Sequence, residues 1–245
     1  MPPSSVKSSG NGFSISFIIP FFNEEGSVEA TVEEAVSTSE KLGIDYEIII
    51  FNDGSSDRTA EIADRLARQN KSIRVFHNRK NMGQGYCITN GFKAASKEWI
   101  TTIPGDRQIS LETLDKFIEK SKDVDLVSGF MLNESQTRTF YRRLISHGFQ
   151  ILNRMLFGIK VRYTNGFTIW RREKLNQIDM SSIGYAILSE IYVNAFRRNW
   201  KYAEEGFYLR PRTTGVEGAS TPRAIIKAIT ECFKLFFRSR KWQRN

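Results

Sequence analysis

Cysteine, histidine and long apolar runs are scarce in this sequence of 245 residues. Its two cysteines, Cys87 and Cys232, match no disulfide framework and no metal-binding spacing, so we expect both to be buried thiols in a reducing compartment. Two histidines are too few for histidine-rich zinc chemistry. No apolar run approaches about 18 residues, which argues against a transmembrane helix. Residues 1–12 lack the apolar core of a signal peptide and predict a short disordered tail.

Positive charge is concentrated at the C-terminal end. The net charge is +9, and residues 222–245 hold seven Lys or Arg against one acid, a net +6 that leaves +3 for the rest of the chain. The body of the chain therefore lacks the basic surface typical of nucleic-acid binders, and we expect no nucleic-acid partner.

Short apolar runs alternate with amphipathic segments over the first hundred residues. The runs predict buried strands at 14–20, 46–51, 73–77 and 98–103, and the segments between them predict helices at 28–42, 59–71 and 86–96. Ser27 is expected to cap the first helix and Gly43 to end it. This order predicts an α/β fold, with a mainly parallel central sheet covered by helices on both faces.

The second half has a looser pattern. It predicts a strand at 124–131, helices at 111–122, 139–157 and 184–199, and two short strands within 160–173 around a turn at Asn165-Gly166. No linker divides the chain, so we expect one domain over 13–221 followed by a basic amphipathic helix over 222–245.

Polar segments follow the predicted strands, at the edge of the sheet where ligands of such folds bind. Asp53 could bind a ribose hydroxyl or a base N–H, or could equally belong to an Asx-turn or a helix cap. The aromatic residues after Pro20 suit either base stacking or the core. Gly83 and Gly85 precede a helix and could bring backbone N–H groups close to a phosphate, although a plain turn has the same pattern.

The segment 104–108, PGDRQ, holds a single carboxylate, Asp106. Mg²⁺ often keeps several waters and uses only one or two carboxylates plus substrate phosphates, so Asp106 could suffice, with Gln108 as a neutral ligand. Gly105 permits close backbone approach and Arg107 adds positive charge. The alternative is an ordinary turn into the next helix, capped by Ser110.

Taken together, six segments resemble the family 2 glycosyltransferases, especially the dolichyl-phosphate mannose synthase-like branch, over roughly residues 13–220. The segments are IIPFFNEE, NDGSSDRT, NMGQGYCITNGFKAA, PGDRQ, YTNGFTIWRRE and GYAILSE. The resemblance implies the GT-A fold, a glycosyltransferase domain over 13–221, and inverting transfer of a sugar from a UDP- or GDP-linked donor with Mg²⁺ or Mn²⁺.

The same resemblance assigns roles to individual residues. Those implied to hold the nucleotide are Pro20, Phe22, Glu24, Asp53, Gly83 and Gly85. It implies that Asp106 and Gln108 bind the metal, and that Asp106, Arg107 and Glu190 take part in catalysis. It also implies that Asn165 and Gly166 contact the donor sugar. Arg142 and Ser146 match residues that hold the lipid phosphate in that branch, although an exposed helix face would show the same spacing.

Three departures from the family pattern stand out. Pro104 replaces the first acid of the metal motif, and Asn52 replaces the first acid of the segment around Asp53. The segment SGFMLN lacks an arginine that the branch uses near the acceptor phosphate. Thin metal ligation leaves open a catalytically weak, nucleotide-binding scaffold.

The C-terminal segment carries apolar residues on one side at helical spacing. They are Ile225, Ile229, Cys232, Phe233, Phe236 and Phe237, with Lys and Arg over much of the rest. This pattern suits a helix at a membrane surface, or one packed on the domain or on another subunit. We therefore expect a peripheral enzyme on the cytoplasmic face of a membrane that glycosylates a polyprenyl phosphate. If the acceptor were instead a glycan or lipid hydroxyl, Glu190 would be the candidate base.

Overall fold

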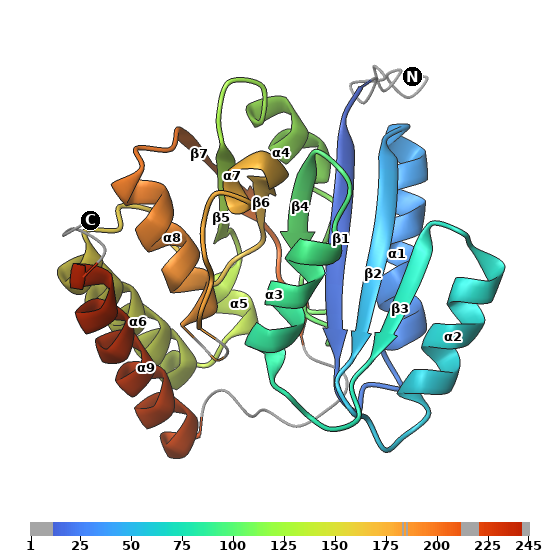
Figure 1. Cartoon of the computed structure of the whole chain (residues 1–245), viewed down its shortest axis with the longest axis horizontal. Helices are drawn as coiled ribbons and strands as arrows, with labels where there is room; N and C mark the ends of the chain where they lie inside the picture. Colours follow the sequence, from blue (N-terminus) through green and yellow to red (C-terminus); the bar gives the residue numbers. More distant parts are fainter. Residues whose placement is uncertain (1–11, 183, 185, 212–220, 242–245) are drawn as a thin grey trace.

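A seven-stranded sheet forms the centre of the computed structural model, which describes residues 12–182, 184, 186–211 and 221–241 (Figure 1). The strand order is β3-β2-β1-β4-β6-β5-β7. The strands are β1 (Ser14–Phe21), β2 (Asp45–Asn52), β3 (Ile73–His77), β4 (Trp99–Thr102), β5 (Leu126–Met131), β6 (Thr168–Arg171) and β7 (Tyr202–Phe207). All neighbouring pairs are parallel except those of β6, which runs antiparallel to β4 and β5.

Helices cover both faces of this sheet. They are α1 (Val28–Leu42), α2 (Thr59–Gln69), α3 (Gln84–Ala94), α4 (Leu114–Lys120), α5 (Glu134–Thr137), α6 (Phe140–Phe157), α7 (Arg172–Leu175), α8 (Ile187–Arg197) and α9 (Pro222–Lys241). Apolar residues of β1 alternate between two core clusters, with Phe17 facing α1, α2 and α4 and Ile18 facing α3 and α8. The mainly parallel α/β fold is thus confirmed.

In the second half one expectation is wrong and one strand was not predicted. Within 160–173 only β6 forms a strand, and the turn before it passes so close to Gly129 that a Cβ on Gly166 would overlap the Gly129 carbonyl oxygen. Strand β7 was not expected, because its sequence YAEEGF has no apolar alternation. Strand β7 lies at the edge of the sheet, where Glu204 forms an ion pair with Arg162 and Glu205 with Lys120. An edge strand can carry such charged side chains.

The ends of α1 give one confirmation and one correction. Gly43 ends the helix in a left-handed conformation with φ 63°. Ser27, however, makes no side-chain cap; its hydroxyl donates to the carbonyl of Gly105 at 2.6 Å. The residue expected to start a helix therefore ties that helix to the loop after β4.

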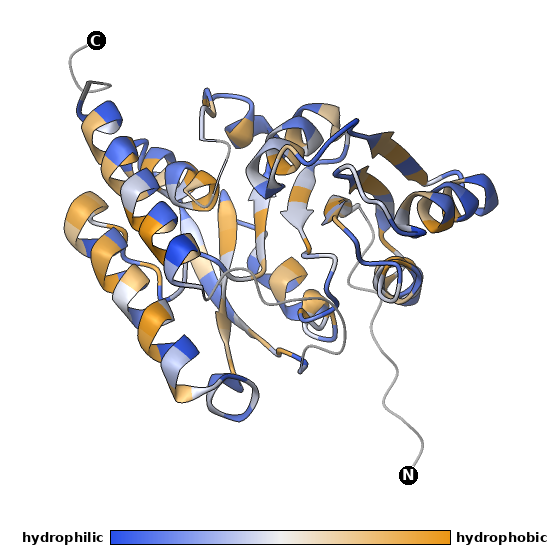
Figure 2. Cartoon of the chain, turned by 90° about the horizontal axis from the view of Figure 1, so that it is seen from below, coloured by the Kyte–Doolittle hydropathy of each residue, from blue (hydrophilic) through white to orange (hydrophobic). Residues whose placement is uncertain are grey.

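Helices α6, α8 and α9 gather on the side of the molecule that carries β5 and the edge strand β7 (Figures 1 and 2). Helix α9 packs on α6 and α8, and Phe157 of α6 meets Phe236 of α9 edge-to-face with ring centroids 6.2 Å apart. Cys232 and Leu235 of α9 are buried, and so is Cys87 in α3, as expected for both thiols. Among the described residues, none of the helices combines the length and apolarity that spanning a bilayer requires.

Candidate active site

Four loops meet at the edge where the parallel strands β1, β2, β3 and β4 end (Figure 1). Their central residues are 20–25, 52–59, 78–83 and 104–108. Side-chain hydrogen bonds to backbone groups join neighbouring loops, so each loop's conformation depends on the next. The polar segments singled out in the sequence therefore converge in space.

Hydrogen bonds join the loops that follow β1 and β2. Asn23, held at φ 53°, accepts from the backbone N–H of Ser56 at 2.8 Å, while its own N–H donates to Ser55 at 3.0 Å. The N–H of Glu25 donates to Asp57 at 3.0 Å. Burial opposes ionisation of Asp57, but hydrogen bonds led by those from Thr59 outweigh it and lower the pKa of Asp57. The protein's own hydrogen bonds therefore hold these two loops against each other.

Asp53 supports the glycine-containing loop before α3. Its buried carboxylate accepts hydrogen bonds from the N–H groups of Met82 and Gly83 and from the Asn78 side chain, each at 2.8 Å. Gly54 passes beneath this loop at φ 72°, where a Cβ would lie 2.5 Å from the backbone of Lys80. Asp53 thus shapes the loop that precedes the α3 N-terminus, a role that the sequence did not indicate.

Asn52 has a structural reason to be an amide. Its Nδ2 donates to Nδ1 of His77 at 3.1 Å, and its Oδ1 accepts from the N–H of Ser55 at 3.2 Å. The other ring nitrogen of His77 lies 3.0 Å from Asp64, which suits an N–H donor at that position. An aspartate at position 52 could not supply the donor, so this departure from the family pattern completes a network.

The loop that carries Asp106 rests on the end of β1. A Cβ on Gly105 would overlap the ring of Phe21 and lie 2.8 Å from the carbonyl oxygen of Pro20. Asp106 is partly buried and accepts from the N–H of Gln108 at 3.2 Å. Arg107 is exposed at φ 58°, a backbone conformation that costs a non-glycine residue free energy. The carboxylate, the arginine and the end of β1 are thereby held together.

An ion pair that the sequence did not reveal fixes the far end of this loop. Arg210, just beyond β7, binds both carboxylate oxygens of Glu34 in α1 at 2.6 and 2.7 Å and also donates to Ser110 at 3.0 Å. Glu34 further accepts from the N–H of Leu111 at 3.0 Å. The hydrogen bonds to Glu34 raise the pKa of Arg210. Because the partners are 176 positions apart in the sequence, no local pattern could indicate the pair.

The donor atoms present fit a divalent cation only if the substrate supplies further ligands. Among the described residues, no group of three or more His, Cys, Asp or Glu side chains could hold a metal. Asp106 offers oxygen ligands, and Gln108 lies two residues further along the chain. Such a set suits Mg²⁺ or Mn²⁺ completed by waters and phosphate oxygens.

The residues expected at the donor sugar and acceptor phosphate lie near one another. Arg142 and Ser146 are partly buried on α6, and Asn165 is exposed on the turn before β6. Gln150, one helical turn beyond Ser146, accepts from both the N–H and the hydroxyl of Thr164 at 3.1 Å. This contact brings the face of α6 next to the turn that contains Gly166.

Glu190 lies inside the protein, not in an open site. Its side chain is fully buried and accepts from Ser181, from the N–H of Ser182 at 2.7 Å and from Arg238 of α9 at 2.8 Å. Each of these partners donates a hydrogen bond to the carboxylate. The structure therefore separates Glu190 from solvent while linking it to the C-terminal helix.

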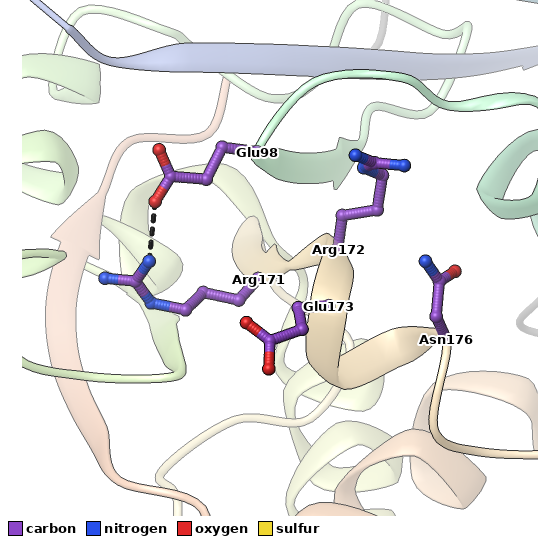
Figure 3. Close-up of a pocket in the computed structure, with 5 residues that line it drawn as sticks. All are labelled: Glu98, Arg171, Arg172, Glu173 and Asn176. Carbon is purple, nitrogen blue, oxygen red and sulfur yellow. Dashed lines mark hydrogen bonds and ion pairs between the residues drawn. The ribbon is translucent and has the colours of Figure 1, made fainter.

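A pocket of about 390 Å³ lies apart from these loops (Figure 3). It is lined by Glu98, Arg171, Arg172, Glu173 and Asn176. Glu98 pairs with Arg171 at 2.5 Å, and the pocket borders the beginning of β4, at the edge of the sheet opposite Asp106. None of the predicted site residues contributes to it.

Known structures resemble this arrangement of strands and loops. Glucosyl-3-phosphoglycerate synthase from Mycobacterium tuberculosis, in complex with uridine diphosphate, matches with a TM-score of 0.66 and 19% identity, over 92% of this chain and 82% of that one. The same enzyme with Mn²⁺, UDP-glucose and phosphoglyceric acid also matches with a TM-score of 0.66, at 18% identity. The fold is thus that of the GT-A class, as the sequence implied.

The family follows from the sequence. The model of glycosyl transferase family 2 matches residues 16–179, and the chain belongs to this family. It is similar to dolichol-phosphate mannosyltransferase of Pyrococcus furiosus, with 28% identity over 94% of this chain and 64% of that protein. It is also similar to undecaprenyl-phosphate 4-deoxy-4-formamido-L-arabinose transferase of Pectobacterium atrosepticum, with 31% identity over 59% of this chain and 44% of that protein. The chain thus spans less than two thirds of these relatives' lengths.

Proposed function

We propose that the protein transfers a sugar, with inversion, from a nucleotide-sugar to a polyprenyl phosphate at a membrane surface. The observation that carries the proposal is the convergence of the loops around Asp53 and Asp106 at one edge of a GT-A fold. Relatives named for dolichol-phosphate and undecaprenyl-phosphate transfer support the acceptor class.

The donor would lie across these loops. Phe22, with 46% of its surface exposed, is available to stack against the base, beside Pro20 and Glu24. Asp53 would act mainly through the loop of Gly83, whose geometry it fixes, with Gly85 in the first turn of α3. Backbone N–H groups at that helix start favour an anionic diphosphate.

Charge at the leaving group is the main catalytic need. Asp106 and Gln108 would hold Mg²⁺ or Mn²⁺, which when bound supplies positive charge at the diphosphate. Arg107, exposed on the same loop, would add a second cation close by. Because this loop has one carboxylate, we expect weaker metal binding than a site with two acids would show.

The acceptor phosphate would bind at α6, through Arg142 and Ser146, facing Asn165 and Gly166 near the donor sugar. A phosphate oxygen is already anionic and attacks without a general base. The buried, paired position of Glu190 supports a role in orienting the site and gives no support to proton abstraction from a hydroxyl acceptor.

Membrane contact would involve both α6 and α9, whose apolar residues lie along one end of the molecule (Figure 2). The exposed apolar side chains are Phe140, Tyr141, Leu144, Ile151 and Met155 on α6, and Ile226, Ile229, Phe233 and Phe237 on α9. Exposed basic residues accompany them on α9 at Arg223, Lys234 and Arg240. This combination suits the cytoplasmic face of an anionic bilayer, where burial and charge attraction add.

A donor screen tests the proposal. The purified chain is incubated with UDP- and GDP-linked sugars, Mg²⁺ or Mn²⁺, and vesicles with and without polyprenyl phosphate. We expect one donor class to give a lipid-linked sugar that requires the polyprenyl phosphate. Transfer to a glycan or lipid hydroxyl instead would overturn the acceptor assignment, and no turnover of any donor would favour a nucleotide-binding scaffold.

A further inference from the structure

The C-terminal helix supplies a cationic partner, Arg238, to the buried carboxylate of Glu190. Arg238 reaches from α9 to Oε1 of Glu190 at 2.8 Å and also donates to the hydroxyl of Ser182 at 2.9 Å. The Glu190 side chain is 0% exposed, whereas that of Arg238 is 36% exposed. The arginine therefore bridges a fully buried acid and the protein surface.

Two more contacts tie α9 to the start and the end of α8. Glu231 accepts from the N–H of Ala186, immediately before α8, at 3.2 Å, and a Cβ on Gly184 would overlap the Glu231 carboxylate. At the other end of α8, Arg197 donates to the backbone carbonyl of Ser239. Helix α9 thus determines how the chain enters α8, at the same edge of the sheet as the candidate site (Figure 1).

The two faces of α9 have different partners. One face contacts α8 through Glu231 and Arg238, while Phe233 and Phe237 on the other are 43% and 63% exposed. A buried carboxylate that loses its cation is strongly destabilised, because desolvation is no longer compensated. Any change in how firmly α9 is seated therefore acts on Glu190 and on the backbone of Ser181 and Ser182 that it holds.

We propose that Arg238 is a positioning residue that couples membrane contact to sugar transfer. An anionic bilayer binds the outer face of α9 and keeps that helix seated. Seated α9 then holds Glu190, Ser182 and the start of α8 in the geometry needed for turnover. The coupling rests on the proposed function, because it takes the bilayer as the partner and transfer as the output.

A double-mutant cycle tests the pair itself. Arg238→Met leaves a buried carboxylate unpaired, so the thermal midpoint should fall by roughly 6–15 °C. Glu190→Gln combined with Arg238→Met removes both charges and should recover a large part of that loss. Lys71→Met, which removes an equal charge from an exposed position after α2, away from α9 and the candidate site, should leave the midpoint unchanged. Losses that simply add in the double variant would overturn the pairing.

Vesicle stimulation tests the coupling. We expect phosphatidylglycerol vesicles to raise kcat of the wild-type chain and of Lys71→Met over neutral vesicles by at least about fivefold. The double variant should bind the vesicles but lose the stimulation, with the KM for the donor little changed. A double variant that binds and is stimulated like wild type would overturn the proposal, although transfer itself would stand.

Hydrogen exchange separates this proposal from the proposed function. If the wild-type chain turned over no donor, the proposed function would be wrong. The coupling would still predict that vesicles slow amide exchange around Ser181, Ser182 and Glu190 in the wild type and not in the double variant. Equal exchange in both chains, with and without vesicles, would overturn the coupling by itself.

Discussion

The edge of the sheet with the loops around Asp53 and Asp106, where we propose that the donor binds and which we call the donor edge, differs in construction from the α6–α9 end of the molecule. At the donor edge, loops are joined by short polar contacts, such as Asp53 to Gly83 at 2.8 Å and Asn23 to Ser56 at 2.8 Å. At the other end, α6 and α9 meet through the ring contact of Phe157 with Phe236. Large side chains of α6 such as Phe140 and Met155 are 75% and 79% exposed. One region is organised for a polar ligand, the other for an apolar surface.

This contrast indicates which parts of the site a ligand would not have to order on binding. The donor loops are already held by the protein, so a nucleotide need not order them, and preorganised charge acts most strongly on a transition state. The α6–α9 face exposes contiguous apolar residues that monomeric soluble proteins normally hide, which indicates a partner. Changes at the two regions should therefore affect different measurements.

The largest effect is expected at the donor edge. Asp106→Asn removes the loop's only carboxylate, so transfer should fall by about 10²- to 10³-fold, the size seen when one group that stabilises developing charge is lost. Steady-state kcat measures the effect. Asp123→Asn, an exposed acid after α4, should retain full activity and the same thermal midpoint. Equal activity in both variants would remove Asp106 from the mechanism.

Vesicle binding should respond at the other region. Replacing Phe233 and Phe237 together by Ser removes two exposed rings, each worth roughly 1.5–3 kcal/mol when fully buried. We expect partitioning onto anionic vesicles, measured by sedimentation, to fall by about 10- to 100-fold without loss of nucleotide binding. Tyr202→Ser, at an exposed ring on β7, serves as the control. Unchanged partitioning would show that the bilayer does not contact this face.

A smaller effect is expected from the ion pair that closes the donor edge. Arg210→Lys cannot keep both hydrogen bonds to Glu34, so the Asp106 loop should loosen and the donor KM should rise by about fivefold, with vesicle binding unchanged. The matched change Arg65→Lys affects a half-exposed pair with Glu29, between α2 and α1, and should have no effect. If Arg210→Lys had the donor KM of the wild type, the Glu34–Arg210 pair would have no influence on donor binding.

The two cysteines give the mildest probe, one in each region. Burial, helped by the charge of Asp53, raises the pKa of Cys87 to about 12, and burial raises that of Cys232 to about 12 as well. At pH 8 only about one thiol in 10⁴ is then ionised, so neither should react with a disulfide reagent in the native protein, and reactivity should appear only near pH 12 or on unfolding. In Arg238→Met, Cys232 should react before Cys87; simultaneous reaction would mean that α9 is not released separately.

The sequence predicted the parallel sheet and the converging loops because both depend on local patterns. Apolar runs such as 14–20 and 46–51 fix buried strands, and residues at strand ends then meet by topology alone. The pairs Glu34–Arg210 and Glu190–Arg238 were missed because their partners are 176 and 48 residues apart. Strand β7 was missed because edge position, not apolarity, permits its two glutamates. The hydrogen bond from Ser27 to Gly105 was missed for the same reason, because the two residues are 78 positions apart.

The most direct test of the central claim is a crystal structure of the chain with Mn²⁺ and the nucleotide-sugar that the donor screen selects. The account predicts the base against Phe22, the diphosphate between the Gly83 loop and the Asp106 loop, and an Asp106 oxygen about 2.0–2.2 Å from the cation. A nucleotide bound at this edge with the Asp106 carboxylate turned away from the metal and the diphosphate would contradict it.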